Sequence, residues 1–318
     1  MLRQLSLAIV VLGPLAACAK TESTPQDTTK TLPPGADAAA APAKVGETPG
    51  MKTPESVRYD PDLDVFFVSN INGNPSVRDG NGFIAVVRAD STAVVKMLAE
   101  GGKNGVTLNA PKGIAITGDT LWVADIDAVR AFNKRTGAPI ATINLAAQKA
   151  TFLNDVAAGP DGSVYITDTG IVFDANGGTT HPGVNRIFKI TAGKVAVAAE
   201  GDSLASPNGI TWDGPFGRWV LAPFGGADVQ TWKEGDKAPS KYASGPGQYD
   251  GVEVLKDGRI LVTSWADNAV HLIPAGGGTM STLVRDVSGP ADIGLDTKRN
   301  VLAVPRFNDG KVEYYKLP

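Results

Sequence analysis

Short apolar stretches separated by turns recur along most of the chain. Six of them open with an apolar residue followed by a polar one, and they span residues 54–60, 111–116, 153–158, 207–212, 249–254 and 291–295. A polar or glycine-containing turn follows each stretch, and a second apolar run follows each turn, as at 65–68 and 121–124. Runs of β-branched and aromatic residues bounded by turn residues are typical of β-strands. The pattern therefore predicts an all-β fold built from repeated strand pairs.

The repeat length indicates the architecture. The polar residues at the second position of successive stretches are 42 to 57 residues apart. A third strand completes most repeats and a fourth precedes the next; examples are 84–87, 129–132, 186–190, 270–273 and 311–315 for the third and 94–96 and 283–284 for the fourth. A four-stranded unit of roughly 45 residues is a propeller blade. The sequence therefore predicts a six-bladed β-propeller over residues 44–318, with a two-sheet sandwich as the alternative.

The sixth repeat is one strand short. It reaches Pro318 with three strands, so we expect the segment 44–47, which precedes the first repeat, to supply its fourth strand. Closure of this kind removes the free sheet edges that otherwise invite aggregation.

Composition limits the chemistry that this fold can carry. The 30 Lys and Arg residues nearly cancel the 33 Asp and Glu residues, for a net charge of −3. This balance argues against a nucleic-acid surface, because phosphate neutralisation requires clustered basic side chains. The chain has two histidines, His181 and His271, and one cysteine, Cys18. Disulfides, iron–sulfur clusters, zinc fingers and multi-histidine metal sites are therefore excluded, and any metal must be held by oxygen ligands.

The N-terminus carries an export pattern. Arg3 precedes the apolar run 5–12, and residues 15–18 read Leu-Ala-Ala-Cys. The run is too short to span a bilayer, and it has the charged start and small cleavage-site residues of a secretory signal. The tetrapeptide resembles the bacterial lipoprotein signal, which implies that residues 1–17 are removed and that the lipidated Cys18 anchors the exported chain to a membrane of the cell envelope. An ordinary signal or a buried free cysteine is the alternative.

A polar segment follows the expected lipidation site. Residues 18–43 are rich in Thr, Pro, Ala and charged residues and contain no aromatic side chain. Such a segment cannot bury enough apolar surface to order itself. We expect it to be a flexible tether between the anchor and the propeller.

The first strand of each propeller blade lines the central channel, so equivalent positions of the six repeats meet on the axis. The polar residues at this position are Glu55, Lys112, Asn154, Asn208, Asp250 and Asp292. Taken singly, sequences such as Pro-Asn-Gly and Tyr-Asp-Gly suit ordinary turns. Three carboxylates in one narrow channel repel each other unless some are protonated or a cation lies among them. Carboxylate and amide oxygens are the ligands of a hard cation such as calcium.

The six repeats and their channel residues resemble the senescence marker protein/gluconolactonase family of six-bladed propellers. That family binds a catalytic divalent metal through a Glu in the first blade, two Asn in middle blades and an Asp in a later blade. Position by position, the resemblance implies Glu55, Asn154, Asn208 and Asp250 as the metal ligands, with Asp250 also acting as general base. It implies calcium as the metal, with zinc, manganese and magnesium as alternatives.

The chain departs from that family at the substrate position. Many sugar-lactonase members have an arginine two residues before the first ligand asparagine, where this chain has Phe152. The resemblance therefore does not extend to a sugar-lactone substrate. Lys112, which lies on the channel, could supply a positive charge instead, or it could pair with Asp292.

The loops that follow the second strands are expected to form the rim of the pocket. The long loops 70–81 and 168–185 contain Arg78 and His181, and shorter loops contain Trp265 and Arg306. The alternative is that these four are ordinary solvated loop residues. His271 lies in a predicted third strand, so we expect it to be structural.

Two functions are consistent with these patterns. The first is an envelope-anchored, metal-dependent hydrolase of a lactone or other ester, in which the metal polarises the carbonyl and activates water. The second is a non-catalytic propeller that binds a ligand or a protein at the cell envelope, with a calcium ion bracing the channel. Fold class alone does not decide between them.

Overall fold

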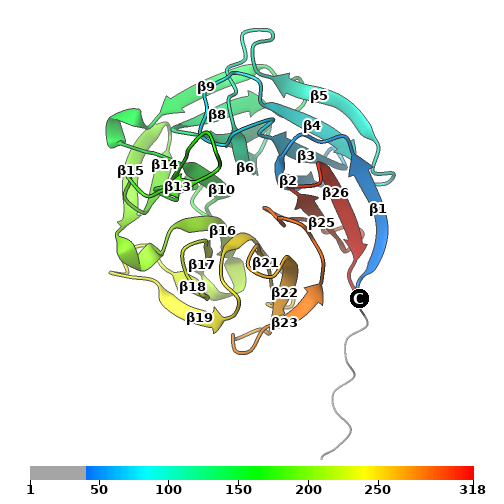
Figure 1. The fold of residues 1–318 in the computed structure, drawn as a ribbon, viewed down its shortest axis with the longest axis vertical. Helices are drawn as coiled ribbons and strands as arrows, with labels where there is room; N and C mark the ends of the chain where they lie inside the picture. The colour runs from blue at the N-terminus through cyan, green and yellow to red at the C-terminus, as the bar shows by residue number, and fades with distance from the viewer. Residues whose placement is uncertain (1–40) are drawn as a thin grey trace, which may run out of the picture. The chain divides into compact units, whose positions relative to one another are not determined.

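The computed structural model describes residues 41–318, which form a six-bladed β-propeller (Figure 1). Six four-stranded antiparallel sheets surround a central axis, as the sequence predicted, and the sandwich alternative is wrong. The predicted signal segment, Cys18 and most of the predicted tether lie outside the described residues. Within residues 41–318, no helix is long and apolar enough to cross a membrane.

Each blade has four strands, which follow one another from the axis outward. Blades 1 to 3 contain β2 (Pro54–Asp60), β3 (Val65–Asn70), β4 (Phe83–Arg88) and β5 (Val94–Glu100); β6 (Pro111–Thr117), β7 (Thr120–Asp125), β8 (Ala128–Asn133) and β9 (Pro139–Asn144); and β10 (Leu153–Ala158), β11 (Val164–Asp168), β14 (Arg186–Thr191) and β15 (Lys194–Glu200). Blades 4 to 6 contain β16 (Pro207–Asp213), β17 (Arg218–Pro223), β18 (Asp228–Trp232) and β19 (Ser240–Ser244); β20 (Tyr249–Val254), β21 (Ile260–Ser264), β22 (Ala269–Ile273) and β23 (Ser281–Val284); and β24 (Gly294–Asp296), β25 (Val301–Arg306), β26 (Lys311–Lys316) and β1 (Ala43–Pro49).

A few short elements lie in the connections between these strands. A two-stranded hairpin, β12 (Val172–Phe173) and β13 (Thr179–Thr180), interrupts the loop between β11 and β14. Single 3-10 turns, η1 (Ala146–Gln148), η2 (Asp202–Leu204) and η3 (Gly214–Phe216), complete the described elements.

The ring is closed by strands from the two ends of the described chain. The strand β1 pairs antiparallel with β26, with Lys44 opposite Tyr315 and Thr48 opposite Val312. Figure 1 shows β1 as the outermost strand of the blade that contains β25 and β26. This confirms the prediction that the segment 44–47 completes the sixth blade.

A buried carboxylate lies at this closure. Glu313, on β26, is 2% exposed. Its oxygens lie 2.7 Å from Lys44 Nζ on β1, 2.9 Å from Lys311 Nζ and 3.0 Å from an Arg306 guanidinium nitrogen, and one accepts a 2.6 Å hydrogen bond from the Tyr315 hydroxyl. These four partners hold the pKa of Glu313 well below its ordinary value despite burial, which acts the other way. The ionised carboxylate therefore joins β1 to the rest of blade 6.

The hydrophobic core lies between neighbouring blades. Phe67 and Ile84 of blade 1 pack with Ile114, Leu121 and Phe132 of blade 2 in one buried cluster. The same arrangement recurs around the ring, so the second strand of a blade is covered on both faces. This explains why the second strands read as continuous apolar runs rather than alternating ones. Full burial of one such phenylalanine or leucine contributes about 1.5–3 kcal/mol.

The innermost strands are irregular at the position that the repeats share. In five blades the pairing with the second strand shifts register there, between Pro54 and Ser56 in blade 1 and at the equivalent places in blades 2 to 5. A β-bulge of this kind re-aims a side chain away from the ordinary strand alternation. The bulges therefore turn one polar side chain of each of these blades toward the axis.

Glycine follows the bulge residue where two inner strands approach closely. A Cβ added to Gly209 would lie 2.1 Å from the carbonyl oxygen of Asp250 on the next blade, and one added to Gly113 would lie 2.4 Å from the Asp155 Cα. Any other residue would push the inner strands apart, so these glycines set the narrow spacing of the polar residues on the axis.

Blade 6 differs from the other five. Its inner strand β24 begins at Gly294, whereas the sequence predicted a strand over 291–295. Asp292 instead forms an isolated parallel bridge with Ser56 of blade 1, donating from its amide to the Glu55 carbonyl at 2.8 Å and accepting at its carbonyl from the Val57 amide at 3.1 Å. Backbone pairing to blade 1 thus replaces pairing within blade 6 at this point.

Candidate functional site

A cavity of about 490 Å³ opens on the axis at the end where the second-to-third-strand loops lie. Its floor consists of the side chains that the bulges turn inward: Glu55, Lys112, Asn154, Asn208 and Asp250. Each is 5% exposed or less. The structure therefore brings together the four predicted metal ligands and Lys112 in one buried layer.

Three oxygens of this layer have no hydrogen-bond partner among the described residues: Glu55 Oε2, Asn154 Oδ1 and Asp250 Oδ1. The opposite atoms of two of these groups are fixed, because Asn154 Nδ2 donates to Thr169 Oγ1 at 3.1 Å and the Trp265 indole donates to Asp250 Oδ2 at 2.9 Å. A buried polar atom without a partner costs about 1–3 kcal/mol. Oxygens held in this way suit a hard cation, which would satisfy all three.

The electrostatics of the layer are consistent with a cation. Burial raises the pKa of Glu55 well above its ordinary value, and the charges of Asp250 and Asp292 raise it further. Burial and the charge of Asp292 also raise the pKa of Asp250, while the hydrogen bond from Trp265 opposes the shift. A divalent cation among these groups would favour their charged forms instead.

The donor set contains only two carboxylates. Among the described residues, no three His, Cys, Asp or Glu side chains cluster as metal ligands. Glu55 and Asp250 are the acidic members of the predicted set, and Asn154 and Asn208 contribute amide groups. Such a mixture of carboxylate and amide oxygens is typical of calcium rather than of zinc, which prefers nitrogen and sulfur ligands.

Lys112 contacts a backbone carbonyl and an aromatic ring, not Asp292. Its Nζ donates to the Ala110 carbonyl at 3.1 Å and lies 4.1 Å from the centre of the Phe152 ring, a cation–π distance. Burial lowers the pKa of Lys112 to about 8, although the charge of Glu55 opposes this shift. No ion pair joins Lys112 to Asp292 in residues 41–318, so the expected alternative pairing is wrong.

Asp292 lies below the cavity and not in its lining. Its Oδ2 accepts hydrogen bonds from Ser56 Oγ at 2.5 Å and from an Arg58 guanidinium nitrogen at 3.3 Å. Arg58 also pairs with Glu253 of blade 5, and its Nε donates to the Ile114 carbonyl at 2.9 Å. Arg58 thus crosses the channel from blade 1 and closes it beneath the floor. The prediction that Asp292 contacts a substrate is corrected by this contact with blade 1.

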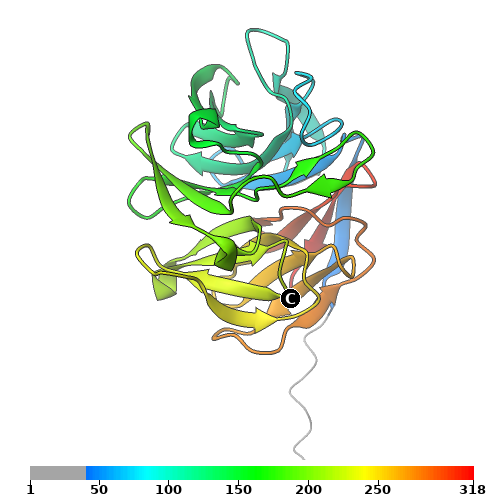
Figure 2. The same ribbon diagram turned by 60° about the vertical axis from the view of Figure 1, so that its left-hand side comes forward.

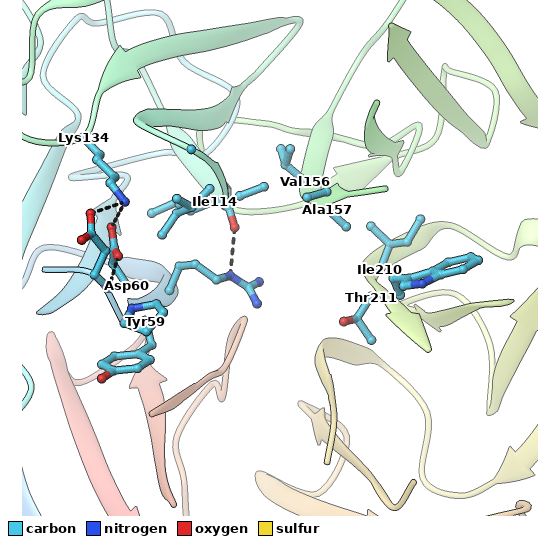
Figure 3. Close-up of a pocket in the computed structure, with 16 residues that line it drawn as sticks. Tyr59, Asp60, Ile114, Lys134, Val156, Ala157, Ile210 and Thr211 are labelled. Atoms are coloured by element: carbon cyan, nitrogen blue, oxygen red, sulfur yellow. Dashed lines mark hydrogen bonds and ion pairs between the residues drawn. The ribbon is translucent and has the colours of Figure 1, made fainter. Parts of the chain in front are cut away.

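A second cavity of about 450 Å³ lies at the opposite mouth of the channel (Figure 3). Arg58 lines it, together with the far ends of the inner strands of blades 1 to 4. Figure 3 shows the pairing of Lys134 with Asp60, whose atoms lie 2.8 Å apart. Since its charged groups already have partners of opposite sign, this cavity has no unpaired cluster comparable to the floor of the first.

The remaining predicted pocket residues divide into two groups. Phe152 and Trp265 line the cavity, as predicted. Arg78, His181 and Arg306 do not. Arg78 pairs with Asp127 at 2.7 Å, Arg306 pairs with Asp309 at 2.6 Å as well as with Glu313, and the exposed His181 lies 2.8 Å from the Asn185 amide. These local partners draw all three side chains away from the cavity, contrary to the prediction.

His271 is buried on β22, as expected of a structural residue. It is 3% exposed, and its Nε2 lies 3.0 Å from a carboxylate oxygen of Asp267. It does not line the axial cavity.

Two positioning carboxylates were not predicted from the sequence. Asp125 accepts hydrogen bonds from the Asn109 and Ala110 amides, and Asp168 accepts from the Phe152 amide at 2.9 Å. These carboxylates fix the loops that lead into the inner strands of blades 2 and 3. The signal is a polar residue that recurs at the end of the second strand, at Asn70, Asp125 and Asp168.

Loops from blades 1 and 3 meet beside the cavity. The Phe173 amide, on β12, donates to Ser76 Oγ at 3.0 Å, and Asn74 Nδ2 donates to the Asp174 carbonyl at 2.8 Å. Figure 2 shows the same propeller turned by 60° about the vertical axis, with connections that extend beyond the sheets. Because Asn74 and Phe173 both line the cavity, the two joined loops form part of its wall.

Three solved structures are similar to this chain at low identity. A candidate gluconolactonase shares 15% identity over 89% of this chain and 93% of its own, with a TM-score of 0.65. The calcium-binding protein regucalcin from Agrobacterium tumefaciens strain C58 shares 16% identity over 88% and 94%, with a TM-score of 0.64. A gluconolactonase from Xanthomonas campestris shares 14% identity over 88% and 96%, with a TM-score of 0.64. These likenesses support the six-bladed fold. No protein-family model matches the sequence, and no curated protein sequence matches it.

Proposed function

We propose that the protein is a divalent-metal-dependent hydrolase of a lactone or other ester. The observation that carries this proposal is the set of three buried, unpartnered oxygens on the cavity floor, from Glu55, Asn154 and Asp250. The structural likeness to a candidate gluconolactonase, to a gluconolactonase and to the calcium-binding protein regucalcin supports it.

Glu55, Asn154, Asn208 and Asp250 would hold the metal, for which calcium fits the donor set best. A bound divalent cation supplies Lewis acidity, polarising a carbonyl oxygen and lowering the pKa of water. The chain provides the remaining functions. The Trp265 indole holds the Asp250 carboxylate through Oδ2, so this carboxylate is fixed in the floor of the cavity, where it would take a proton from the attacking water.

The other residues of the cavity position the substrate. Lys112 provides a basic side chain whose charge interacts with that of Glu55, at a site that burial shields from solvent. Apolar side chains above the floor reduce the number of competing waters near the reacting carbonyl.

Hydrolysis of a panel of lactones and aryl esters tests this proposal. Chelator-treated protein should be inactive and should recover with calcium. Asp250→Ala and Asn208→Ala should each abolish hydrolysis with the fold retained, whereas Asp257→Ala, in an exposed turn of the same blade 5, should not. Unchanged activity in either floor variant would contradict the mechanism. Stabilisation by calcium without turnover would favour the non-catalytic binding protein.

The location proposed for this activity is the cell envelope, with Cys18 lipidated. The support is the Leu-Ala-Ala-Cys sequence at residues 15–18. Fractionation of cells that express the full chain tests it, since the protein should remain with membranes. A Cys18→Ser variant should leave the membrane fraction, and retention of this variant would contradict lipid anchoring.

A further inference from the structure

The walls of the axial cavity differ sharply in chemistry from its floor. Above the polar floor, the lining side chains are mainly large and apolar: Ile71, Phe152, Phe173, Phe224, Trp265 and Phe307. The charged residues that line the cavity, Glu55, Lys112 and Asp250, all belong to the floor. A ligand that reaches the floor must therefore place the rest of its body against apolar surface.

The aromatic residues form two groups contributed by different blades. Trp265 of blade 5 lies edge-to-face with Phe224 of blade 4, at 6.2 Å between ring centres, and with Phe307 of blade 6, at 5.2 Å. In blade 3, Phe152 lies 5.6 Å from Phe173 of the β12–β13 hairpin. Blades 3 and 6 are on opposite sides of a six-bladed ring, so the two groups flank the cavity (Figure 1).

Four of these rings are only partly buried by the protein itself. Phe173, Phe224, Trp265 and Phe307 have intermediate exposure, although all four line the cavity. Binding of an apolar ligand to this surface is favourable because it removes apolar area of both the ligand and the protein from water. The cavity volume of about 490 Å³ lies within the usual range of small-molecule sites, about 300–1,000 Å³.

The polar side chains of the walls are largely engaged within the protein. Asn74 donates to the Asp174 carbonyl and accepts from the Ser76 amide at 2.8 Å. Thr169 Oγ1 donates to the Pro207 carbonyl at 2.9 Å and accepts from Asn154. Asn308 Nδ2 donates to Ser288 Oγ at 3.3 Å. A polyhydroxylated ligand would bury hydroxyl groups here with few partners, which is costly.

We propose that the ligand of this cavity is a lactone whose ring bears an aromatic or alkyl body, and not a polyhydroxylated sugar lactone. This inference rests on the proposed function. The apolar body packs between the two aromatic groups, and the ester carbonyl reaches the floor at Glu55 and Asp250. Hydrolysis consumes one water: its oxygen bonds to the acyl carbon, the ring C–O bond breaks, and the leaving oxygen takes a proton to give the hydroxy acid. Asp250 holds the proton in transit.

Turnover of two lactones provides the first test. The calcium-loaded full chain is assayed with dihydrocoumarin and with D-glucono-1,5-lactone. We expect kcat/KM to be at least about a hundredfold higher for dihydrocoumarin, since a single added hydroxyl already costs about that factor in a hydrophobic pocket. Measurable hydrolysis of both lactones with equal kcat/KM, or a preference for the sugar lactone, would overturn the inference.

Binding of lactam analogues tests the same preference without requiring catalysis. Calorimetry compares 3,4-dihydro-2-quinolinone with D-gluconolactam. At least about tenfold tighter binding of the quinolinone is expected. Equal binding, tighter binding of the gluconolactam or failure of the quinolinone to bind would overturn the inference. Binding of the quinolinone by a protein that hydrolyses neither lactone would refute the proposed hydrolase and still support the apolar ligand class.

A substitution in the aromatic wall tests whether these side chains cause the preference for the quinolinone. Phe307→Ala should weaken binding of the quinolinone about tenfold or more and leave the weak binding of the gluconolactam unchanged. Phe307→Leu retains apolar area and should lose less affinity for the quinolinone than Phe307→Ala. The matched control is Phe216→Ala, because Phe216 is 49% exposed and packs on Arg218 outside the cavity. If both alanine variants bind the quinolinone equally, the aromatic walls do not recognise the ligand and the inference fails.

Discussion

Trp265 links the aromatic wall of the cavity to its polar floor. Its indole nitrogen donates to Asp250 Oδ2 at 2.9 Å, while its ring packs between Phe224 and Phe307. The substitution Trp265→Phe removes the hydrogen bond and keeps an aromatic ring in the wall. It therefore separates the support of Asp250 from the packing of the cavity.

The size of the effect follows from the charge of Asp250. A hydrogen bond to a charged group contributes about 1.5–3 kcal/mol. Because the Trp265 hydrogen bond lowers the pKa of Asp250, its loss raises that pKa, and each pKa unit corresponds to about 1.4 kcal/mol. A carboxylate must be ionised to bind a cation. We therefore expect the calcium affinity at pH 7 to fall about 10–100-fold, the range found when the hydrogen-bond partner of a metal ligand is removed.

Calorimetric titration of chelator-treated protein with calcium measures this loss. The control is Trp122→Phe, because the Trp122 indole donates to Thr117 Oγ1 at 2.7 Å in blade 2, away from the cavity. This control should bind calcium with unchanged affinity. Part of the affinity of Trp265→Phe should return at higher pH, where Asp250 ionises. Wild-type affinity in Trp265→Phe, or an equal loss in the control, would refute the reasoning.

Three further predictions concern stability. Glu313→Gln should lower the free energy of unfolding in urea by about 3 kcal/mol, because it breaks a buried ionic cluster. The control Glu47→Gln removes an exposed partner of the same lysines and should cost much less stability, so equal losses would count against a role of the buried carboxylate in closure. Burial raises the pKa of Glu253 from 4.5 to about 7. The stabilising contribution of protonated Glu253 is therefore present below pH 4.5 and lost as the pH rises through 7. Glu253→Gln should flatten this decline in melting temperature with pH, and an unchanged pH profile of the variant would contradict the prediction. Because the pKa values of Glu55 and Asp250 are also raised, chelator-treated protein should lose stability as the pH rises. Calcium should therefore raise the melting temperature more at pH 8 than at pH 5. An equal rise at both pH values would exclude these carboxylates as ligands.

The features that repeat along the chain were predictable from the sequence. Apolar runs and turns recur in every repeat, and they predicted the six blades, the closure by 44–47 and the polar layer on the axis. These features depend on local periodicity, which one sequence contains in six copies. The four ligands predicted from the resemblance gather on one floor because each lies at the same bulge of its own blade.

The features that depend on a single distant contact were not predictable. Asp292 occupies the repeated position, but its side chain turns to Ser56 and Arg58, more than 230 residues earlier in the chain. Arg78 was expected on the pocket rim, yet Asp127 of the neighbouring blade binds it. The apolar wall was predicted only in part, through Phe152 and Trp265, for a different reason. Phe224 and Phe307 lie in loops, where sequence patterns of strands give no indication of what a side chain faces.

The pairing of β1 with β26 constrains the order in which this chain can fold. Blade 6 contains residues from both ends of the described segment, so it cannot be completed until Lys316 has been synthesised. Until then, the growing chain exposes the apolar face of blade 1 that packs against blade 6 once the ring is closed. Contacts of such high sequence separation slow folding, because the entropy of a long loop must be lost before they form. Ring closure is therefore a late, cooperative event, and a chain truncated at either end would remain an open and aggregation-prone arc.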